Sequence, residues 1–291
     1  MKYSNPHIPE GINSTETNPL KEFLLLTSAV VVGVIIITAV IAMLVDSIAE
    51  YIPFEFEQTV ARQVIEKLNK GNAEVDGYLQ HLSDQIVPFM DLPEGVKIKL
   101  HYVNDDVVNA MATLGGHIIL YRGLLEKLPN ENALVMLLGH EIGHVKMRHP
   151  VKALGKGVII SLLMSAVLGE SSDAVATVIS DTSMLTMLGY SREQEQLSDE
   201  AGLHVMHAFY GHVKGATNLF EVLQQQNNEQ VFKLPQFLNS HPDTGFRIKY
   251  LKQLAETKRW DQQGKINFVP DYILNILAED KKVIAELQEP V

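Results

Sequence analysis

The apolar residues near the N-terminus form one long, uncharged run. A polar stretch at 1–22 precedes it, and the run itself extends from Phe23 to Val45. As a helix it would be about 35 Å long, enough to cross the roughly 30 Å hydrocarbon core of a bilayer. Core helices of this length without a polar face are rare, and no small-residue cleavage site of a signal peptide follows. The pattern therefore predicts one transmembrane helix at 23–45 after a polar tail at 1–22.

The charges that flank this span predict its orientation in the membrane. Lys2 and Lys21 precede it, whereas the first basic residue after it is Arg62. Cytoplasmic flanks of membrane spans carry an excess of lysine and arginine. We therefore expect a single-pass membrane protein with a cytoplasmic N-terminus and its bulk outside the cytoplasm. In a bacterium, that would be the periplasmic side of the inner membrane.

After the span, the pattern predicts a helix at about 55–70 and then a small sheet. Alternating or short apolar runs, separated by turn residues, are typical of strands. Gly115-Gly116 predict a turn before the last of these runs. The predicted strands are at 96–103, 107–112 and His117–Tyr121.

From about Asn130 onward, the apolar residues recur at helical spacing. We therefore expect an α+β fold that is mostly helical, with a domain at 46–260 and a helical extension at 261–291. The apolar segment Val158–Leu168 is too short to cross a bilayer. It predicts either a core helix or a lid that lies against the membrane surface.

Composition narrows the function classes. The 291 residues carry a formal net charge of −11, which would repel the phosphates of a nucleic acid, so no nucleic-acid partner is expected. The chain has no cysteine, which excludes disulfides and thiolate metal sites. Any metal ion must therefore be held by histidine or carboxylate side chains.

The chemistry of the chain is concentrated in one predicted helix at 130–150, NENALVMLLGHEIGHVKMRHP. It contains His140-Glu141-Ile142-Gly143-His144, an HExxH pattern. Histidines one helical turn apart share a helix face, so both imidazoles can bind one ion, and the glutamate can act as general base toward a water molecule. Burying these polar groups is costly unless a metal compensates them.

A catalytic zinc site normally has three protein ligands, so a third must come from elsewhere. His149 does not fit the metzincin pattern, which requires glycine and histidine where this chain has Lys146 and Pro150. Glu195 and Asp199 lie one turn apart on another predicted helix, so one could bind the metal while the other orients a ligand histidine. The same spacing also fits a solvated helix face.

Further motifs occur in order around HEIGH. SREQEQLSDEAG follows at 191–202. The others are Asn109-Ala110, Gly115-Gly116-His117, Gly123-Leu124-Leu125 and Ser240-His241-Pro242 with Arg247. From about residue 96 to 250 the chain thus resembles the gluzincin endopeptidases. That family includes the heat-shock protease HtpX, the CAAX prenyl protease of the Ste type, the outer-membrane protease BepA and the mitochondrial OMA-type protease.

The resemblance implies a zincin-like fold with a small sheet beside the HExxH helix and one zinc ion per chain. The implied zinc ligands are His140, His144 and Glu195. Asp199 would hydrogen-bond a ligand histidine, and Glu141 would be the general base. By the same resemblance, His241 and Arg247 would lie near the metal and stabilise the oxyanion, or His241 would occupy the open coordination position.

The resemblance also implies where a substrate binds. The residues His117, Ile118, Ile119, Leu120 and Tyr121 would form the sheet edge beside the cleft, on which an extended peptide adds a strand. The chain departs from the family in having a single predicted span, where HtpX and the CAAX protease have several. It also lacks the tetratricopeptide-like repeats of BepA.

These features predict a membrane-anchored zinc metalloendopeptidase that cleaves misfolded or membrane-derived polypeptides in quality control of membrane or envelope proteins. Residues 23–45 would contact the bilayer. One alternative is a membrane-tethered, zinc-containing binding or chaperone-like module with little proteolysis. A zinc hydrolase that is not a peptidase is less consistent with the sheet edge.

Overall fold

The computed structural model describes residues 18–68, 71–168, 189–229, 237, 241 and 244–288. The chain forms two compact units, Met1–Leu44 and Val45–Val291. The domain boundaries expected from the sequence, after residues 22, 45 and 260, remain predictions.

The first unit consists of most of helix α1, which spans Pro19–Ile48. Its segment Pro19–Ile41 is long and apolar enough to cross a membrane, and its most apolar stretch has no residue buried inside the protein. This segment overlaps the span expected at 23–45. A helix suited to bilayer contact therefore stands at the predicted position.

The second unit contains a small mixed sheet. Its strands are β1 (Lys99–Val103), β2 (Ala110–Ala112) and β3 (His117–Tyr121), in the order β1-β3-β2. Strand β3 pairs with β1 in parallel and with β2 in antiparallel orientation.

The expectation that His117, Ile118, Ile119, Leu120 and Tyr121 form a sheet edge is therefore wrong. Both sides of β3 are hydrogen-bonded to neighbouring strands, which leaves β1 and β2 at the edges. Strand β3 lies next to β1 because the two pair in parallel. The order of the strands along the sequence does not reveal this arrangement.

The turn before β3 requires glycine. Gly115 and Gly116 have φ values of 68° and 77°, a region that other residues rarely adopt. A Cβ on Gly116 would lie 2.2 Å from the carbonyl oxygen of Lys97. The turn expected at Gly115-Gly116 is thus confirmed.

Nine helices accompany the sheet in the described part of the second unit. They are α2 (Phe54–Ile65), α3 (Ala73–Ile86), α4 (Arg122–Leu125), α5 (Glu131–Lys146), α6 (His149–Leu168), α9 (Arg192–Tyr210), α10 (Asn218–Glu229), α12 (Thr244–Lys258) and α13 (Asp271–Gln288).

The prediction of one helix running to Pro150 needs a correction. Helix α5 ends at Lys146, and Arg148 adopts a left-handed conformation with φ of 59° that redirects the chain. Pro150 therefore lies in the first turn of α6, where its missing N–H has no intrahelical partner to lose. Val158–Leu168 forms the second half of α6.

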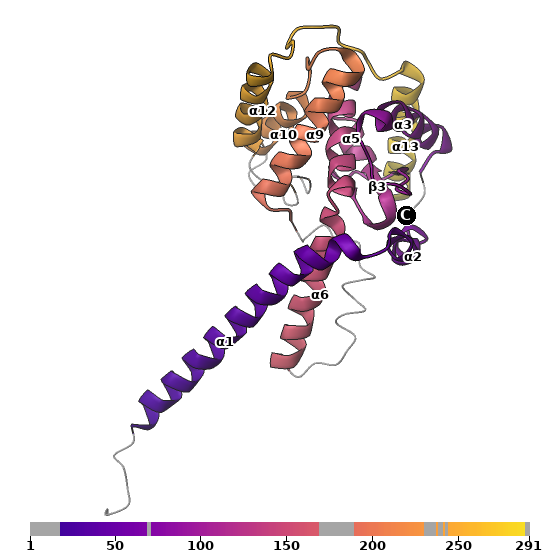
Figure 1. The fold of residues 1–291 in the computed structure, drawn as a ribbon. Coiled ribbons are helices and arrows are strands. Elements are labelled where there is room, and N and C mark those ends of the chain that lie inside the picture. The colour runs from indigo at the N-terminus through magenta and orange to yellow at the C-terminus, as the bar shows by residue number, and fades with distance from the viewer. Residues whose placement is uncertain are drawn as a thin grey trace, which may run out of the picture. The chain divides into compact units, whose positions relative to one another are not determined.

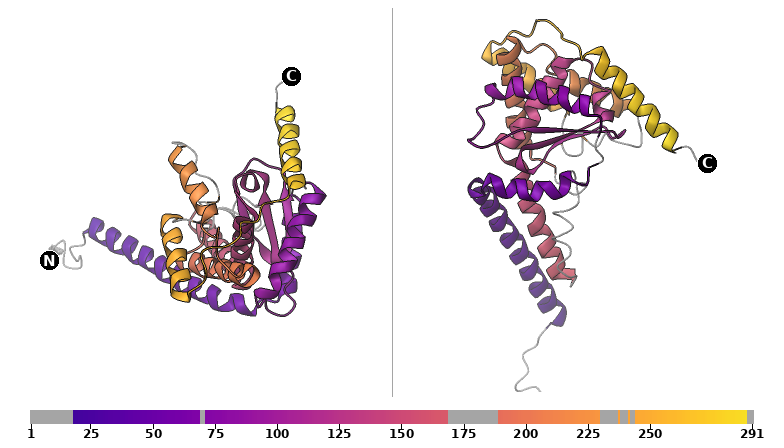
Figure 2. Two further views of the ribbon diagram at one scale, coloured as in Figure 1. Left: turned by 90° about the horizontal axis from the view of Figure 1, so that it is seen from above. Right: turned by 90° about the vertical axis from the view of Figure 1, so that its right-hand side faces the viewer.

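Helix α5 lies at the centre of the second unit, between the sheet and α9 (Figures 1 and 2). Every residue from Asn132 to Val145 is buried. Its neighbours on the sheet are the alternating residues Leu100, Tyr102, Ile118 and Leu120, which point into the same apolar core. Since these α5 residues are buried, the polar groups among them need partners inside the protein or in a bound ligand.

Two glycines allow α5 and α9 to approach closely. A Cβ added to Gly139 would lie 2.8 Å from the Cα of Gly202, and one added to Gly202 would lie 2.9 Å from the carbonyl oxygen of Met136. Real Cβ atoms essentially never come so near. The short distance between these helices therefore depends on both glycines.

We expect Gly139→Ala to destabilise the protein by about 1–3 kcal/mol, since an overpacked core must shift to accept the extra methyl group. Helix propensity alone would favour alanine by about 1 kcal/mol. Gly77→Ala on α3 is the matched control, because nothing lies within 4 Å of its added Cβ. Thermal unfolding of both variants tests this. A stabilised Gly139→Ala variant would contradict the packing described here.

Candidate metal centre

Helix α5 carries two histidines whose side chains converge on one point. The helix begins at a defined residue, because the Asn130 side chain accepts a hydrogen bond from the Ala133 N–H at 2.8 Å. His140 and His144 then lie one turn apart, with their Nε2 atoms separated by 3.0 Å. Both side chains are buried. Their spacing confirms that the two imidazoles converge.

Helix α9 brings a carboxylate to the same point. A capping box starts this helix: the Ser191 hydroxyl accepts from the Gln194 N–H, and the Gln194 side chain accepts from the Ser191 N–H. Glu195 then lies in the first turn, facing α5. Its oxygens are 3.7 Å from His140 Nε2 and 3.5 Å from His144 Nε2.

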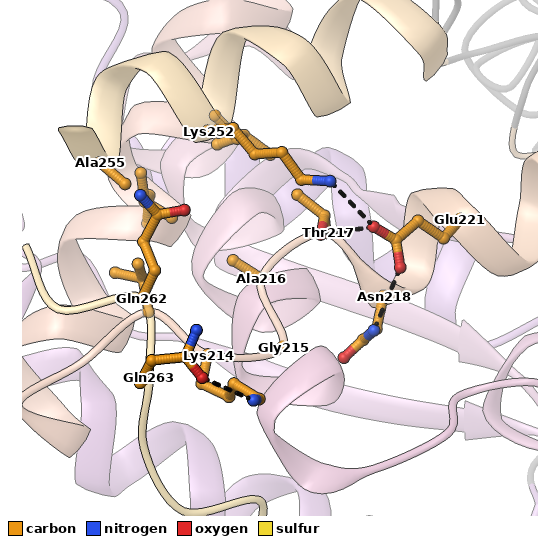
Figure 3. Close-up of a pocket in the computed structure, with 13 residues that line it drawn as sticks. Lys214, Gly215, Ala216, Thr217, Asn218, Glu221, Lys252, Ala255, Gln262 and Gln263 are labelled. Carbon is orange, nitrogen blue, oxygen red and sulfur yellow. Dashed lines mark hydrogen bonds and ion pairs between the residues drawn. The ribbon is translucent and has the colours of Figure 1, made fainter. Parts of the chain in front are cut away.

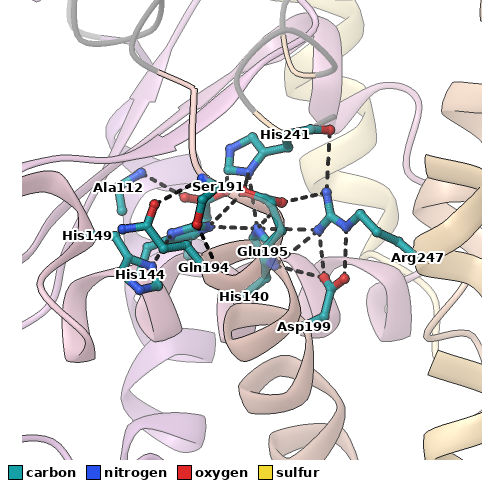
Figure 4. A network of polar contacts seen from close by, with 11 residues as sticks. Ala112, His140, His144, His149, Ser191, Gln194, Glu195, Asp199, His241 and Arg247 are labelled. Atoms are coloured by element: carbon teal, nitrogen blue, oxygen red, sulfur yellow. Dashed lines mark hydrogen bonds and ion pairs between the residues drawn. The ribbon is translucent and has the colours of Figure 1, made fainter. Parts of the chain in front are cut away.

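His241 completes the cluster from a third part of the chain (Figure 4). Its Nδ1 lies 2.9 Å from Glu195 Oε1 and 3.2 Å from His140 Nε2. The donor atoms of His140, His144, Glu195 and His241 all lie within 4.8 Å of one another. Around a tetrahedral zinc ion with ligands at about 2.0–2.1 Å, donor atoms would be roughly 3.4 Å apart. The donor set therefore fits one metal ion.

The charges of the cluster also fit a divalent cation. Glu141, Glu195 and Asp199 place three carboxylates among side chains that are at most 2% exposed, and Arg247 supplies one guanidinium. The formal sum over these four side chains is minus two. Uncompensated charge is costly in a protein interior, and a divalent ion would balance it.

Among the described residues, Glu141 Oε1 and His241 Nε2 are two of the buried polar atoms without a hydrogen-bond partner, and they lie 3.7 Å apart. Buried polar atoms are nearly always paired, so these two atoms are available to a bound ligand.

Asp199 and Arg247 hold the His140 side chain in place. Asp199 Oδ1 is 3.0 Å from His140 Nδ1, and Arg247 binds both carboxylate oxygens of Asp199, at 2.6 and 2.8 Å. Burial opposes ionisation, but Arg247 and His140 outweigh it and lower the pKa of Asp199 to about 2. Asp199 is thus an anion that accepts the His140 N–H and leaves Nε2 free for a metal.

Arg247 contacts the cluster through two carboxylates, those of Asp199 and Glu195. Besides Asp199, its Nη1 pairs with Glu195 Oε2 at 2.8 Å, and its guanidinium stacks on Phe220 at 4.4 Å. Its proximity to His140 and Glu195 agrees with the expectation for Arg247. The role of oxyanion stabiliser remains a prediction.

The electrostatics of the cluster favour a neutral His144 and an ionised Glu195, the forms in which these side chains bind metals. Burial and the neighbouring His140 hold the pKa of His144 well below its usual value, which keeps this imidazole neutral. Burial would raise the pKa of Glu195, but His241 and Arg247 outweigh it and lower that pKa. For His241, Glu195 and Glu141 outweigh burial and raise the pKa.

Glu141 is oriented by the sheet. The backbone N–H of Ala112 on β2 donates to Glu141 Oε2 at 2.7 Å. The other carboxylate oxygen is the unpartnered one near His241. Glu141 is thus fixed with one oxygen toward the cluster, as a general base requires.

Comparison with known families shows the family of the chain. The model of peptidase family M48 matches residues 73–255, more than half of the chain. The chain belongs to peptidase family M48. This confirms the metallopeptidase family expected from the motifs, and the match spans α3 to α12.

Curated proteins similar to this M48 chain are proteases. The beta-barrel assembly-enhancing protease of Yersinia pestis is 26% identical over 190 residues, 61% of this chain and 38% of that protein. The mitochondrial metalloendopeptidase OMA1 of Arabidopsis thaliana is 25% identical over 198 residues, 68% of this chain and 37% of that protein. The match thus spans less than two fifths of the length of either relative.

Two residues near the M48 centre were not assigned to it from the sequence. His149 Nδ1 lies 2.8 Å from His144 Nδ1, and the Tyr190 ring stacks on the His144 ring at 3.9 Å. The sequence does not fit His149 as a metal ligand, because the metzincin pattern is absent. The position of His149 five residues after His144 was the available signal in the sequence.

A pocket of about 240 Å³ shares no residue with the metal centre (Figure 3). It lies where α10 begins, opposite α12. Its polar groups satisfy one another: Glu221 accepts from the Thr217 hydroxyl at 2.8 Å and pairs with Lys252 at 3.5 Å, and Lys214 Nζ donates to Gln263. The pocket therefore gives no sign of a missing ligand.

We expect His149→Ala to weaken metal binding about 10–100-fold, because His144 would lose the partner that fixes its ring. His149→Asn can hydrogen-bond at this position and should restore part of the affinity. Competition with a chromogenic chelator measures the dissociation constant of each variant. Equal affinities in His149→Ala and the unmodified protein would contradict this role.

Proposed function

We propose that this M48 chain is a membrane-anchored, zinc-dependent endopeptidase. The observation that carries the proposal is the convergence of His140, His144 and Glu195 around one point, with Glu141 held beside it. The family match and the printed names of the relatives, a protease and a metalloendopeptidase, support the same activity.

Zinc suits these donors better than calcium or magnesium does. The proposed ligand set is His140, His144 and Glu195, a combination of two imidazoles and a carboxylate that catalytic zinc sites use. Calcium and magnesium prefer all-oxygen ligands. When bound, zinc would polarise the scissile carbonyl and lower the pKa of a water molecule toward neutrality.

The side chains around that ion would handle the proton. Glu141 Oε1 would accept a proton from the attacking water and then deliver it to the leaving amine. The Ala112 N–H keeps the other oxygen in place, so the carboxylate need not reorient between the two transfers. His241 would complete the ligand set at rest through Nδ1, or stabilise the oxyanion when substrate occupies that position.

We place the substrate along the edge strand β2, and no longer along β3, which is the central strand. Ala110–Ala112 is an edge strand of the sheet in the described part of the chain, and it borders Glu141. An extended peptide that adds to this edge would bring its carbonyl groups toward the metal ligands.

The proposed substrates are misfolded or membrane-derived polypeptides, and the proposed role is quality control of membrane or envelope proteins. Helix α1 would anchor the chain, with the catalytic unit on the extracytoplasmic side as the flanking lysines indicate. One relative is named for enhancing beta-barrel assembly and another for its mitochondrial location, and both names fit a membrane setting.

We expect Glu141→Gln to keep its zinc and to lose about 10²–10⁴-fold in the rate of peptide cleavage, because the amide cannot accept the proton. His140→Ala is the companion variant and should lose both metal and activity. Elemental analysis and a casein cleavage assay measure the two properties. Undiminished cleavage by Glu141→Gln would contradict the mechanism. A zinc-loaded unmodified protein without cleavage would favour the tethered binding module instead.

A further inference from the structure

The chain just after the candidate span has large apolar side chains on its surface. Ile48 is 55% exposed, Tyr51 is 84% exposed and Phe56 is 60% exposed. They lie at the end of α1, in the short helix η1 (Ala49–Tyr51) and in the first turn of α2. All three belong to the second unit.

The opposite side of this segment is fixed to the second unit. Ala49 and Ala61 are buried against Leu114 and Val151, and Ile52 packs on the same cluster. The backbone around the exposed residues is therefore held in place. Their apolar side chains point outward from an ordered segment, which indicates a surface that another apolar phase covers.

Polar contacts tie the same segment to the metal centre. Glu57 of α2 accepts from the Gly115 N–H at 3.1 Å and pairs with Arg148. Arg148 also donates to the Ile52 carbonyl at 2.6 Å. Gly115 precedes β3, and Arg148 follows the metal-binding helix α5. Displacement of this segment would thus disturb both sides of the site.

Helix α6 begins at the same cluster. Val151 is buried in it and Leu154 packs against it. The helix then continues to Leu168 through the apolar sequence VIISLLMSAVL at 158–168. A second apolar element thus starts beside Ile48, Tyr51 and Phe56.

We propose that Ile48, Tyr51 and Phe56 form a membrane-contact patch that lies in the headgroup region of the bilayer crossed by α1. The inference rests on the anchor included in the proposed function. Chain continuity keeps the patch close to the span, which ends at Ile41. Aromatic side chains favour this interface because their rings are apolar and their edges are polar.

The charges around the patch decide the kind of lipid contact. Glu50 and Glu55 are exposed beside it. Acidic residues would not attract anionic headgroups, so the contact is one of apolar insertion into a zwitterionic interface. By holding the patch at the bilayer, the protein would keep the metal-binding helix α5 at a fixed distance from the membrane surface.

The absence of cysteine permits a direct test in the full chain. Single nitroxide labels are attached to Tyr51→Cys and Phe56→Cys in phosphatidylcholine nanodiscs. Collision rates with oxygen and with a water-soluble nickel complex give their depth. We expect both labels about 5–10 Å inside the headgroup boundary. Phe268→Cys is the matched control: Phe268 is 72% exposed, and the α12–α13 connection that carries it lies at the other end of this unit (Figure 1).

A further label at Val32→Cys separates this proposal from the anchor. Val32 lies within the candidate span and is 53% exposed. If the label at residue 32 contacts lipid while those at 51 and 56 are as accessible to nickel as that at 268, the patch is overturned and the anchor stands. If all four labels are accessible to nickel, the anchor fails and the patch with it.

Discussion

The compensation of buried charge is the constraint on which the rest of this structure depends. Glu141, Glu195 and Asp199 are buried together, and Arg247 balances the charge of only one of them. A divalent cation held by His140 and His144 would remove the remaining excess of negative charge. The metal is thus expected to support the fold as well as the chemistry, since binding energy at a preformed site adds to stability.

The position of that cation depends on how closely two helices pack. Glycines at 139 and 202 let the α5 and α9 backbones meet, and the capping box at Ser191 starts α9 so that Glu195 faces the histidines. Longer side chains at either glycine would separate the carboxylate from the imidazoles. The apolar packing of the core therefore determines the geometry of the polar centre.

Much of the site could be predicted because local spacing determines it. HExxH on a helix brings His140 and His144 together whatever the surroundings, and the motif around Glu195 predicted a partner helix that the structure contains. The contacts of Asp199 with His140, and of Arg247 with Asp199, agree with the second role that the sequence allowed.

The remaining features depend on distant parts of the chain. The order of the strands depends on the parallel pairing of β1 with β3, which no local sequence pattern predicts. The sequence therefore suggested β3 as an edge strand, but β2 occupies that edge. The end of α5 was placed too late, because a left-handed Arg148 carries no strong signal in sequence. The contact of His149 with His144 was also not predicted, because it depends on how the chain turns between α5 and α6.

The central claim is that two imidazoles of α5 and a carboxylate of α9 bind one divalent ion. Anomalous diffraction at the zinc absorption edge from crystals of the purified protein tests it most directly. We expect one strong peak per chain, about 2.0–2.2 Å from His140 Nε2, His144 Nε2 and an oxygen of Glu195. A peak bound by other residues, or a Glu195 side chain turned away from the ion, would contradict the account.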